Sequence, residues 1–509
     1  MARYKQTDTE NGQGLFLVVN LKEQLLPGTF EYMLNDLIND GTIDVSIFDK
    51  NYRNDATGAT AIPPAALIKL IIYGYRKGIK SSRALAELAA NNIIAKALTC
   101  DLQPHWTTIA DFISGNSEAF QEIFVNVLAY GVELDLIGGE NYSTDGLRLP
   151  SNASVEMSGT EEELKKRMEL YRRMAQKHVA KHRKLDEYGG QDTEAKRRYE
   201  ERQKHLKTQV EKIRSFIDGM EKKEGRKNEE IKSNVTDNES ATIHSRKGYI
   251  QGYIGIAVAD RKNQIIVNAQ AVGSANEGEH LPDILDGTLN NLKKARLESN
   301  RDTKPVFTMD ANYFSEKNFR VCEERGVEAV IADPQHRKRY GLKPDGIKEE
   351  KQFEVDDFIY HKEGNYYECP NGKRLEFKGD CTLGAAERKT YQAVLNDCRT
   401  CPKARQCIKT KKEMSELKQG KKLILSKSNE VGNLTAAMRK KLETEEVQNI
   451  YAYRIQIIEP VFSSIAYCKG LNRFMLRGKR KVNGQWKLYC IVHNLSKCLG
   501  EYNKERDYG

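Results

Sequence analysis

Several features are missing from this sequence, and each absence narrows the kind of protein it describes. The chain opens Met-Ala-Arg-Tyr-Lys-Gln, without the apolar core of a secretory signal. It also lacks any run of about 18 apolar residues, the length needed to span a membrane. Its 10 cysteines are few for a secreted chain of 509 residues, which argues against a disulfide framework. We therefore expect a cytoplasmic protein with reduced thiols and no membrane partner.

A strong excess of charge of one sign is also absent. Charged residues make up 30% of the chain, but the formal net charge is only +10. Such a surface attracts polyanions weakly, so charge alone gives little support for a DNA partner. The length predicts several domains, roughly two to four.

The first part of the chain, residues 1–135, has the pattern of packed helices. Pro64 can open one helix, and a break at residues 77–80 separates it from the next. This arrangement is compatible with a helix-turn-helix, and an ordinary helical corner is the alternative. We expect a helical DNA-binding or dimerisation region here, with Lys80 and Arg83 as candidate DNA contacts.

Strand and helix signals alternate in the middle of the chain. Strand signals occur at residues 141–149, 249–259, 264–272, 305–309 and 327–332, and helix signals at 281–292 and 315–325. This order predicts an α/β fold with a mixed sheet covered by helices. Asp145 lies within the first strand and Asp310 at the end of a later one, so adjacent strands could bring these two carboxylates together.

Two segments interrupt the α/β pattern. Residues 160–232 are rich in Lys, Arg, Glu and Gln, but apolar residues recur at alternating steps of four and three. This pattern predicts an antiparallel helical hairpin with a solvated charged face, and contact with the DNA backbone is the alternative. Residues 336–430 form a basic, cysteine-bearing insertion. The other expected domains are 136–159 and 233–335, which form the sheet core, and 431–509, which holds the C-terminal catalytic and closing helices.

Four cysteines in the second insertion have the spacing of metal ligands. Cys398 and Cys401 form a C-x-x-C pair, which can place two thiolates on one tetrahedral ion. Cys369 and Cys407 could complete the set, with Cys381 as an alternative ligand. Free cytosolic thiols are the competing interpretation of a structural zinc site.

Three separate stretches each present one carboxylate suited to a metal: Asp145 in Tyr-Ser-Thr-Asp-Gly, Asp310 in Thr-Met-Asp-Ala-Asn, and Glu459 in Ile-Ile-Glu-Pro-Val-Phe. Each also has an ordinary interpretation as a turn residue, a helix cap or a solvated side chain. Together they suit Mg²⁺, because two such ions about 3.5 to 4 Å apart can stabilise both oxygens in phosphoryl transfer. Asp237 is a rival first carboxylate with a weaker strand context. Pro460 predicts a kink or a helix start at Glu459.

In their order and combination, these motifs resemble those of the DDE transposases of bacterial insertion sequences, whose core has an RNase H-like fold. The resemblance covers nearly the whole chain and is closest to the branch with a helical N-terminal domain and a cysteine-bearing insertion. Its motifs include Gly-Ile-Lys-Ser-Ser-Arg (78–83), Thr-Asp-Gly-Leu-Arg-Leu-Pro-Ser-Asn-Ala-Ser (144–154), Lys-Gly-Tyr-Ile-Gln-Gly-Tyr (247–253), Asp-Ala-Asn-Tyr-Phe-Ser (310–315), Glu-Pro-Val-Phe (459–462) and Arg-Phe-Met-Leu-Arg-Gly (473–478).

The resemblance implies a catalytic, metal-binding triad of Asp145, Asp310 and Glu459, which would hold two Mg²⁺ ions with Mn²⁺ as a substitute. Arg454 would contact DNA phosphate or orient the site. The implied reaction is hydrolysis at the terminal inverted repeats of a transposon, followed by attack of the freed 3′-hydroxyl on target DNA. Because two ends must be processed, a homodimer on DNA is expected.

The sequence departs from related chains beyond Glu459, where a Glu-Pro-Val-Phe-Gly-x-Ile-Lys pattern is usual. Ala466 stands at the lysine position. The basic contact to the transposon end would then come from Lys469, Arg473 or Arg477. Two rival functions share much of this pattern: an RNase H-like nuclease without strand transfer, and a catalytically silent DNA-binding protein derived from a transposase.

Overall fold

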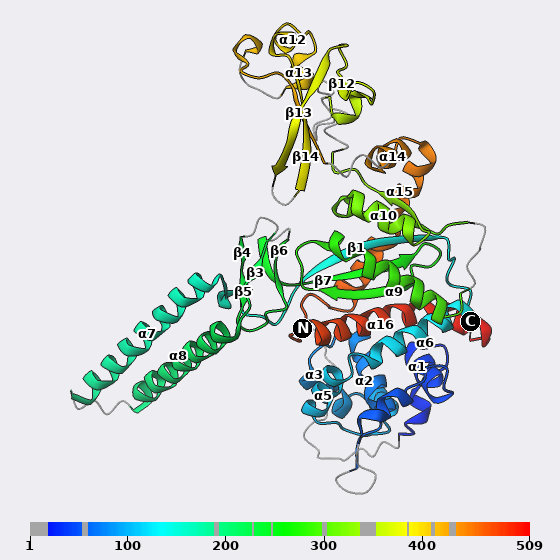
Figure 1. The fold of residues 1–509 in the computed structure, drawn as a ribbon. Helices are drawn as coiled ribbons and strands as arrows, with labels where there is room; N and C mark the ends of the chain where they lie inside the picture. The colour runs from blue at the N-terminus through cyan, green and yellow to red at the C-terminus, as the bar shows by residue number, and fades with distance from the viewer. Residues whose placement is uncertain are drawn as a thin grey trace, which may run out of the picture.

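The computed structural model describes residues 19–52, 60–187, 193–225, 229–245, 248–297, 303–335, 353–383, 386–408, 413–426 and 434–508. Figure 1 shows a group of N-terminal helices, a central sheet with its helices, two long helices that project to one side, and a small separate sheet. The expected domain limits at residues 1, 336, 430, 431 and 509 lie outside the described residues, and the domain limits as a whole remain predictions.

The N-terminal part of the chain folds into helices. They are α1 (Phe30–Asn39), α2 (Pro64–Arg76), α3 (Ser82–Asn91), α4 (Ile93–Thr99), α5 (Trp106–Gly115) and α6 (Ala119–Glu133). α2 begins with proline in its first turn, as expected. Gly78 follows it with a φ of 77°, a left-handed conformation that glycine adopts readily. The hydroxyl of Ser81 then accepts the backbone N–H of Ala84 and caps α3.

The central sheet contains both antiparallel and parallel pairs. Its strands are β1 (Asn141–Pro150), β6 (Ala241–Ser245), β7 (Gly248–Asp260), β8 (Ile266–Val272), β9 (Val306–Met309) and β10 (Glu328–Ile331). β7 pairs antiparallel with β1, β6 and β8. On its other edge β1 pairs parallel with β9, which pairs parallel with β10. The mixed sheet and the α/β class predicted from the strand and helix signals are therefore confirmed.

The C-terminal helix α16 (Lys479–Glu505) joins the sheet to the N-terminal helices, and Figure 1 shows it running between them. The indole N–H of its buried Trp486 donates to the carbonyl of Ile256 on β7 at 2.9 Å. The side chain of Asn494 bonds to both backbone groups of Ile266 on β8. Tyr489 stacks on Tyr75 of α2, with ring centroids 4.5 Å apart. One helix therefore anchors two layers of the protein.

The helix α15 (Glu445–Ser463) continues through Pro460, so Glu459 lies inside it and the expected helix start at that residue is wrong. Proline has no N–H, which leaves the carbonyl of Gln456, four residues earlier, without its helical donor. The side-chain amide of Gln264 donates to that carbonyl at 2.9 Å. A π-helical turn, Ser464–Cys468, follows directly. A tertiary hydrogen bond thus compensates for the proline.

Two long helices, α7 (Glu161–Glu187) and α8 (Thr193–Gly219), pack side by side and project from the sheet (Figure 1). They occupy the segment where the repeating apolar pattern predicts a hairpin. Leu164 and Ile213 are fully buried between them, whereas most of their charged side chains face solvent. At the base, β2 (Ser158–Gly159) pairs with β5 (Ser233–Asn234) and joins the two ends of the segment.

The cysteine-bearing segment contains an antiparallel sheet that was not predicted. Its strands are β11 (Ile359–His361), β12 (Tyr366–Glu368), β13 (Arg374–Leu383), β14 (Ala386–Ala393) and β15 (Lys422–Ser426). The sheet has a small core of its own around Phe358, Leu375 and Tyr391.

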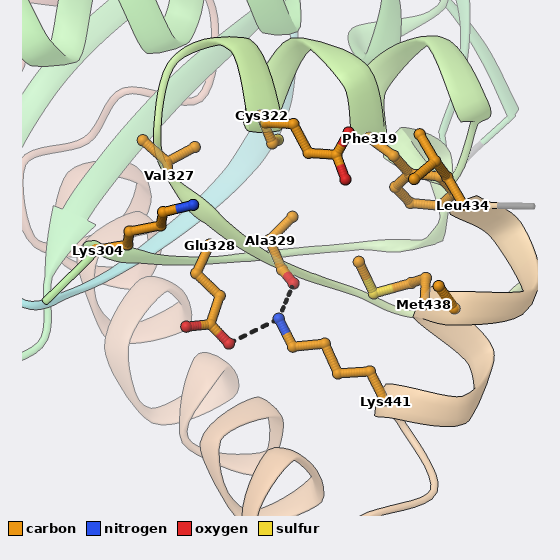
Figure 2. A pocket seen from close by; sticks show the side chains of 11 residues that line it. Lys304, Phe319, Cys322, Val327, Glu328, Ala329, Leu434, Met438 and Lys441 are labelled. Carbon is orange, nitrogen blue, oxygen red and sulfur yellow. Dashed lines mark hydrogen bonds and ion pairs between the residues drawn. The ribbon is translucent and has the colours of Figure 1, made fainter. Parts of the chain in front are cut away.

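The helix α14 (Leu434–Lys441) packs against α10 (Glu316–Glu324), and its last residue reaches the edge strand β10. Figure 2 shows how the ammonium group of Lys441 reaches the carbonyl of Ala329 at 2.8 Å and the carboxylate of Glu328 at 2.7 Å. The carbonyl of Ala329, which lies on the edge strand of the sheet, thereby gains a hydrogen-bond donor. The groove beside this contact has a volume of about 350 Å³ and contains none of the predicted site residues. Among the described helices, none is long and apolar enough to cross a membrane.

Substituting Ala for Gly255 on β7 should destabilise the protein. The added Cβ would lie 2.9 Å from the ring of Trp486, and overpacking of this kind costs about 1–3 kcal/mol. Gly500→Ala in α16 is the matched control, because no atom lies within 4 Å of its added Cβ. That control should gain up to about 1 kcal/mol from helix propensity. Denaturant unfolding measures both, and an unchanged midpoint for Gly255→Ala would contradict the packing described above.

Candidate active site

Asp145 and Asp310 lie next to each other on adjacent strands. Thr144 of β1 pairs with Met309 of β9, and the two aspartates are the next residues along these parallel strands. β9 ends at this point, and the carboxylate of Asp310 accepts two hydrogen bonds from Asn312, at 2.9 Å from the backbone and 3.0 Å from the side chain. The adjacency expected from the strand order is therefore present.

Arg454 of α15 binds one of these carboxylates directly. Its Nη2 lies 2.5 Å from Oδ2 of Asp145, while the backbone N–H of Gly146 donates to Oδ1 at 2.8 Å. Burial raises the pKa of Asp145, the charge of Arg454 opposes that effect, and the nearby Asp310 raises the pKa further. The ion pair thus favours the ionised form of a carboxylate that burial alone would neutralise.

A third buried carboxylate, which the sequence did not suggest, lies close enough to feel the charges of these two aspartates. Glu277 lies in the 3₁₀ turn η4 (Glu277–His280), and its side chain is only 2% exposed. Its Oε1 accepts from Nη2 of Arg148 at 3.3 Å, whereas Oε2 has no hydrogen-bond partner among the described residues. Burial, followed by the negative charges of Asp145 and Asp310, raises the pKa of Glu277 to about 7, and Arg148 opposes this rise.

Other buried polar atoms around the cluster are also unpartnered. In the part of the chain that the structure describes, they include the hydroxyls of Tyr313 and Thr144 and the Nε of Arg454. Burial raises the pKa of Tyr313 well above its usual value, and the charges of Glu277 and Asp145 add to this effect. The carboxylate oxygens of Asp145 and Asp310 are hard donors of the kind that a divalent cation such as Mg²⁺ prefers, whereas the Nε–H of Arg454 can only donate a hydrogen bond.

Glu459 occupies a different position from the other two predicted ligands. It follows Arg454 by five residues, which turns it about 140° around the helix at about 100° per residue. Its side chain is exposed, and among the described residues it makes no hydrogen bond or ion pair. No three acidic, histidine or cysteine side chains in the described ranges stand ready to hold a metal. The role of Glu459 as a ligand stays a prediction.

The rival carboxylate Asp237 has a clear structural role. It is buried, and both of its oxygens accept from the hydroxyl of Tyr253, at 2.8 and 2.9 Å. Since this bond ties the segment after the hairpin to β7, Asp145 remains the better candidate for the site.

The two lysines among the predicted DNA contacts are held by internal hydrogen bonds. The ammonium group of Lys80 donates to the carbonyl of Gly470 and to the side chain of Asn472. Lys469 is only 5% exposed and donates to the hydroxyl of Ser464 at 2.6 Å, and burial lowers its pKa to about 8. In this conformation Lys469 is therefore not presented to DNA.

The arginines among the predicted contacts are more accessible. Arg473 and Arg477 are exposed, and each donates its Nε to a backbone carbonyl in residues 151–152, just after β1. The guanidinium of Arg83 lies 4.7 Å above the partly exposed ring of Trp106. The guanidinium groups of these three arginines lie at the surface, where phosphate groups could reach them.

The four predicted zinc ligands gather at one end of the small sheet. Cys369 lies in the turn between β12 and β13, Cys398 in α12 (Leu395–Arg399) and Cys407 at the end of α13 (Ala404–Cys407). Burial and the neighbouring thiols of Cys369, Cys401 and Cys398 raise the pKa of Cys407 to about 11. All four are free thiols. Cys381 lies elsewhere on β13, where its thiol is 3.3 Å from the hydroxyl of Thr390.

Two backbone N–H groups point at the sulfurs of this cluster. Lys373 donates to Sγ of Cys369 and Lys421 to Sγ of Cys398, each at 3.3 Å. Hydrogen bonds of this kind stabilise thiolates around a metal. Four thiols are a donor set that zinc accepts, but in the described residues these side chains are not placed as a ready metal site.

Two family models match separate parts of the chain. A transposase DDE domain matches residues 368–499, which include Arg454, Glu459 and the four clustered cysteines. A second transposase domain matches residues 19–115, which hold the N-terminal helices α1 to α5. No curated protein matches the chain. Both models describe transposase domains, and the resemblance of this chain to the DDE transposases of insertion sequences is confirmed.

Proposed function

We propose that this protein binds the terminal inverted repeats of a transposon in the cytoplasm, cleaves the ends and joins the freed 3′-hydroxyl to target DNA. The observation that carries the proposal is the juxtaposition of Asp145, Asp310 and Arg454 in a chain with two transposase domains. Adjacent acidic side chains on a rigid sheet suit phosphoryl transfer, which needs fixed positions and stabilised charge more than covalent chemistry.

An RNase H-like core is part of this proposal. The strands β1, β7 and β8 are joined antiparallel, and β9 and β10 extend the sheet on the parallel side of β1. The helices α9 (Leu281–Lys294), α15 and α16 pack against this sheet. A mixed sheet with helices on it and aspartates at the centre supports the core that the resemblance implies.

In the proposed site, Asp145 and Asp310 would hold the cations, and Arg454 would orient Asp145 and keep it ionised. Glu459 would complete the set from α15 once that helix turns about its axis and presents the carboxylate to the strands. When bound, two Mg²⁺ ions, or Mn²⁺ in their place, would supply activation of the attacking oxygen and stabilisation of the leaving oxygen. The exposed Arg473 and Arg477 would bind the phosphates of the transposon end.

Strand transfer by the purified protein is the direct test. With Mg²⁺, labelled DNA that carries the element's ends and a plasmid target, we expect end-joined products. Asp310→Asn should reduce them by at least about a hundredfold. Even the mutation of a residue that only hydrogen-bonds to a metal ligand can lower activity by about that factor. Asp286→Asn, which changes an exposed aspartate paired with Arg325, is the matched control and should keep activity.

The other outcomes separate the rival functions. Cleavage without joining would instead identify a nuclease of the same fold. DNA binding with neither product, unchanged by Asp310→Asn, would identify a catalytically silent DNA-binding protein. Either result would overturn the transposase proposal.

Structural zinc in the small sheet is a second part of the proposal. A tetrahedral Cys₄ site would involve Cys369, Cys398, Cys401 and Cys407 and would join α12 and α13 to the sheet. Such a site can supply much of the folding free energy of a module with a small core. The contacts that support it are the N–H···S bonds and the mutual proximity of the thiols.

Metal analysis after reducing, chelator-free purification should find one zinc per chain. Cys398→Ser should remove it and lower the unfolding midpoint of the small sheet, because the remaining thiols cannot complete the tetrahedron. Cys381→Ser is the matched control and should retain zinc. A wild-type protein without zinc would refute the site, and zinc loss in Cys381→Ser would point to a different ligand set.

A homodimer on DNA is also proposed, with the α7–α8 pair as the element that helps to form it. The pair projects from the sheet (Figure 1) and carries an exposed leucine, Leu170, on α7. Two active sites must act on two transposon ends, and a projecting pair of helices can reach a second protomer.

The pairing of Gly159 with Ser233 at the base of the hairpin allows a clean deletion. Replacing residues 160–232 with Asn-Gly should close a short β-turn and leave the sheet intact. We expect binding to a single transposon end to persist while complexes with two paired ends are lost in gel-shift experiments. Paired-end complexes that form as well as those of the wild type would contradict the role of the hairpin.

A further inference from the structure

The connection between α15 and α16 and the start of α16 carry a dense run of cations. Five of the nine residues from 473 to 481 are lysine or arginine, and none is acidic. This basic tract consists of Arg473, Arg477, Lys479, Arg480 and Lys481, and all five side chains are exposed. Its five positive charges are concentrated in one short segment of a chain whose net charge is only +10. A surface of this kind attracts polyanions.

Backbone contacts orient the two arginines of the tract. Nε of Arg473 donates to the carbonyl of Ser151 at 3.1 Å, and Nε of Arg477 donates to the carbonyl of Asn152 at 2.7 Å. Among the described residues, neither guanidinium forms an ion pair with a carboxylate. Because Nε is already bonded, each guanidinium is held in place while its Nη groups can bind a phosphate.

The other three cations occupy an unfavourable end of a helix. Lys479, Arg480 and Lys481 are the first three residues of α16, where the helix dipole disfavours positive charge. Arg480 lies 3.7 Å from Glu118, but both side chains are exposed, and such pairs contribute little to stability. In the described parts of the chain, Lys479 and Lys481 form no ion pair, although Glu239 accepts the backbone N–H of Lys479. Internal contacts therefore do not account for these cations.

The helices on either side of the tract pack on the face of the sheet that holds Asp145. Trp486 of α16 packs against Gly255 of β7, and Gly255 pairs with Leu147 of β1. Leu147 lies two residues beyond Asp145 and therefore on the same face of the strand. Arg454 of α15 reaches Asp145 from this side. The loop that joins the two helices thus lies beside the candidate site.

The separation between the tract and Asp145 suits one DNA duplex. The backbone N–H of Phe474 donates to the carbonyl of Pro150, the last residue of β1, at 2.9 Å. Pro150 follows Asp145 by five residues, which is about 17 Å at about 3.3 Å per residue. That length corresponds to about five base pairs at about 3.4 Å each. A duplex with one phosphate at Asp145 would therefore extend over the tract.

We propose that the basic tract binds the phosphate backbone of the transposon-end duplex, about five base pairs from the phosphate at Asp145. This inference rests on the proposed function. Lys479, Arg480 and Lys481 would add three contacts to those of Arg473 and Arg477. The donors would be side chains that reach phosphates rather than base edges, so the tract would hold the duplex in place without reading its sequence.

The salt dependence of DNA binding tests the three added contacts. Fluorescence anisotropy measures binding of the full-length protein to a labelled transposon-end duplex at several salt concentrations, without added Mg²⁺. The variant Lys479→Gln/Arg480→Gln/Lys481→Gln should bind more weakly. Its plot of log affinity against log salt should be less steep by about 2 to 3, since each phosphate contact contributes about 0.9. A scrambled duplex should lose affinity equally, because phosphate contacts carry no sequence information.

A matched variant controls for the loss of three positive charges. Lys293→Gln/Lys294→Gln/Arg296→Gln removes three exposed cations from the C-terminal end of α9, where the helix dipole favours them. This control should keep the slope of the wild type. In denaturant unfolding, the midpoint should rise in the tract variant and fall in the control. An equal loss of slope in both variants, or a tract variant that is only less stable, would overturn the inference.

The remaining outcomes separate this inference from the proposed function. An unchanged slope in the tract variant, with end joining by the wild type, overturns the inference and leaves the function standing. A wild type that neither binds nor cleaves the transposon end overturns both. If the triple variant does not fold, Lys481→Gln alone should reduce the slope by about 1, and an unchanged slope in that variant overturns the inference.

Discussion

The parallel pairing of β1 with β9 ends at Thr144 and Met309, and the next residue on each strand is an aspartate. This register alone puts two carboxylates side by side in a partly buried place. Their mutual repulsion and desolvation must be offset by groups from elsewhere in the chain. The features that distinguish this region, namely the arginines, the unpartnered polar atoms and the orientation of α15, follow from that constraint.

The cation that contacts Asp145 comes from a helix more than three hundred residues away, at Arg454. That helix runs through a proline, and the side chain of Gln264 replaces the hydrogen bond that the proline removes. Gln264 follows β7, and its carbonyl and side chain in turn contact His493 and Lys497 of α16. The short ion pair between Arg454 and Asp145 therefore depends on packing between the sheet and both C-terminal helices. A defect in that packing would shift the position of Arg454 relative to Asp145.

The strands that carry Asp145 and Asp310 could be predicted because their apolar, β-branched residues are a local signal. The burial of Glu277 could not, since it depends on packing against Gly146 in another strand. The side of α15 on which Glu459 lies, and the burial of Lys469, are likewise decided by tertiary packing. The strands of the small sheet were missed because many of their side chains are charged and exposed, which hides the alternation that marks a strand.

The predicted ligands differ in how firmly the fold holds them. Asp145 and Asp310 are fixed side by side by strand register, whereas Glu459 stands on the exposed flank of α15. A residue fixed by strand register keeps its position without DNA, but a residue on the far flank of a helix reaches the strands only when that helix turns about its axis. In the proposed function, binding of the DNA phosphate backbone would supply that change. Full assembly of the centre would then be restricted to the bound complex.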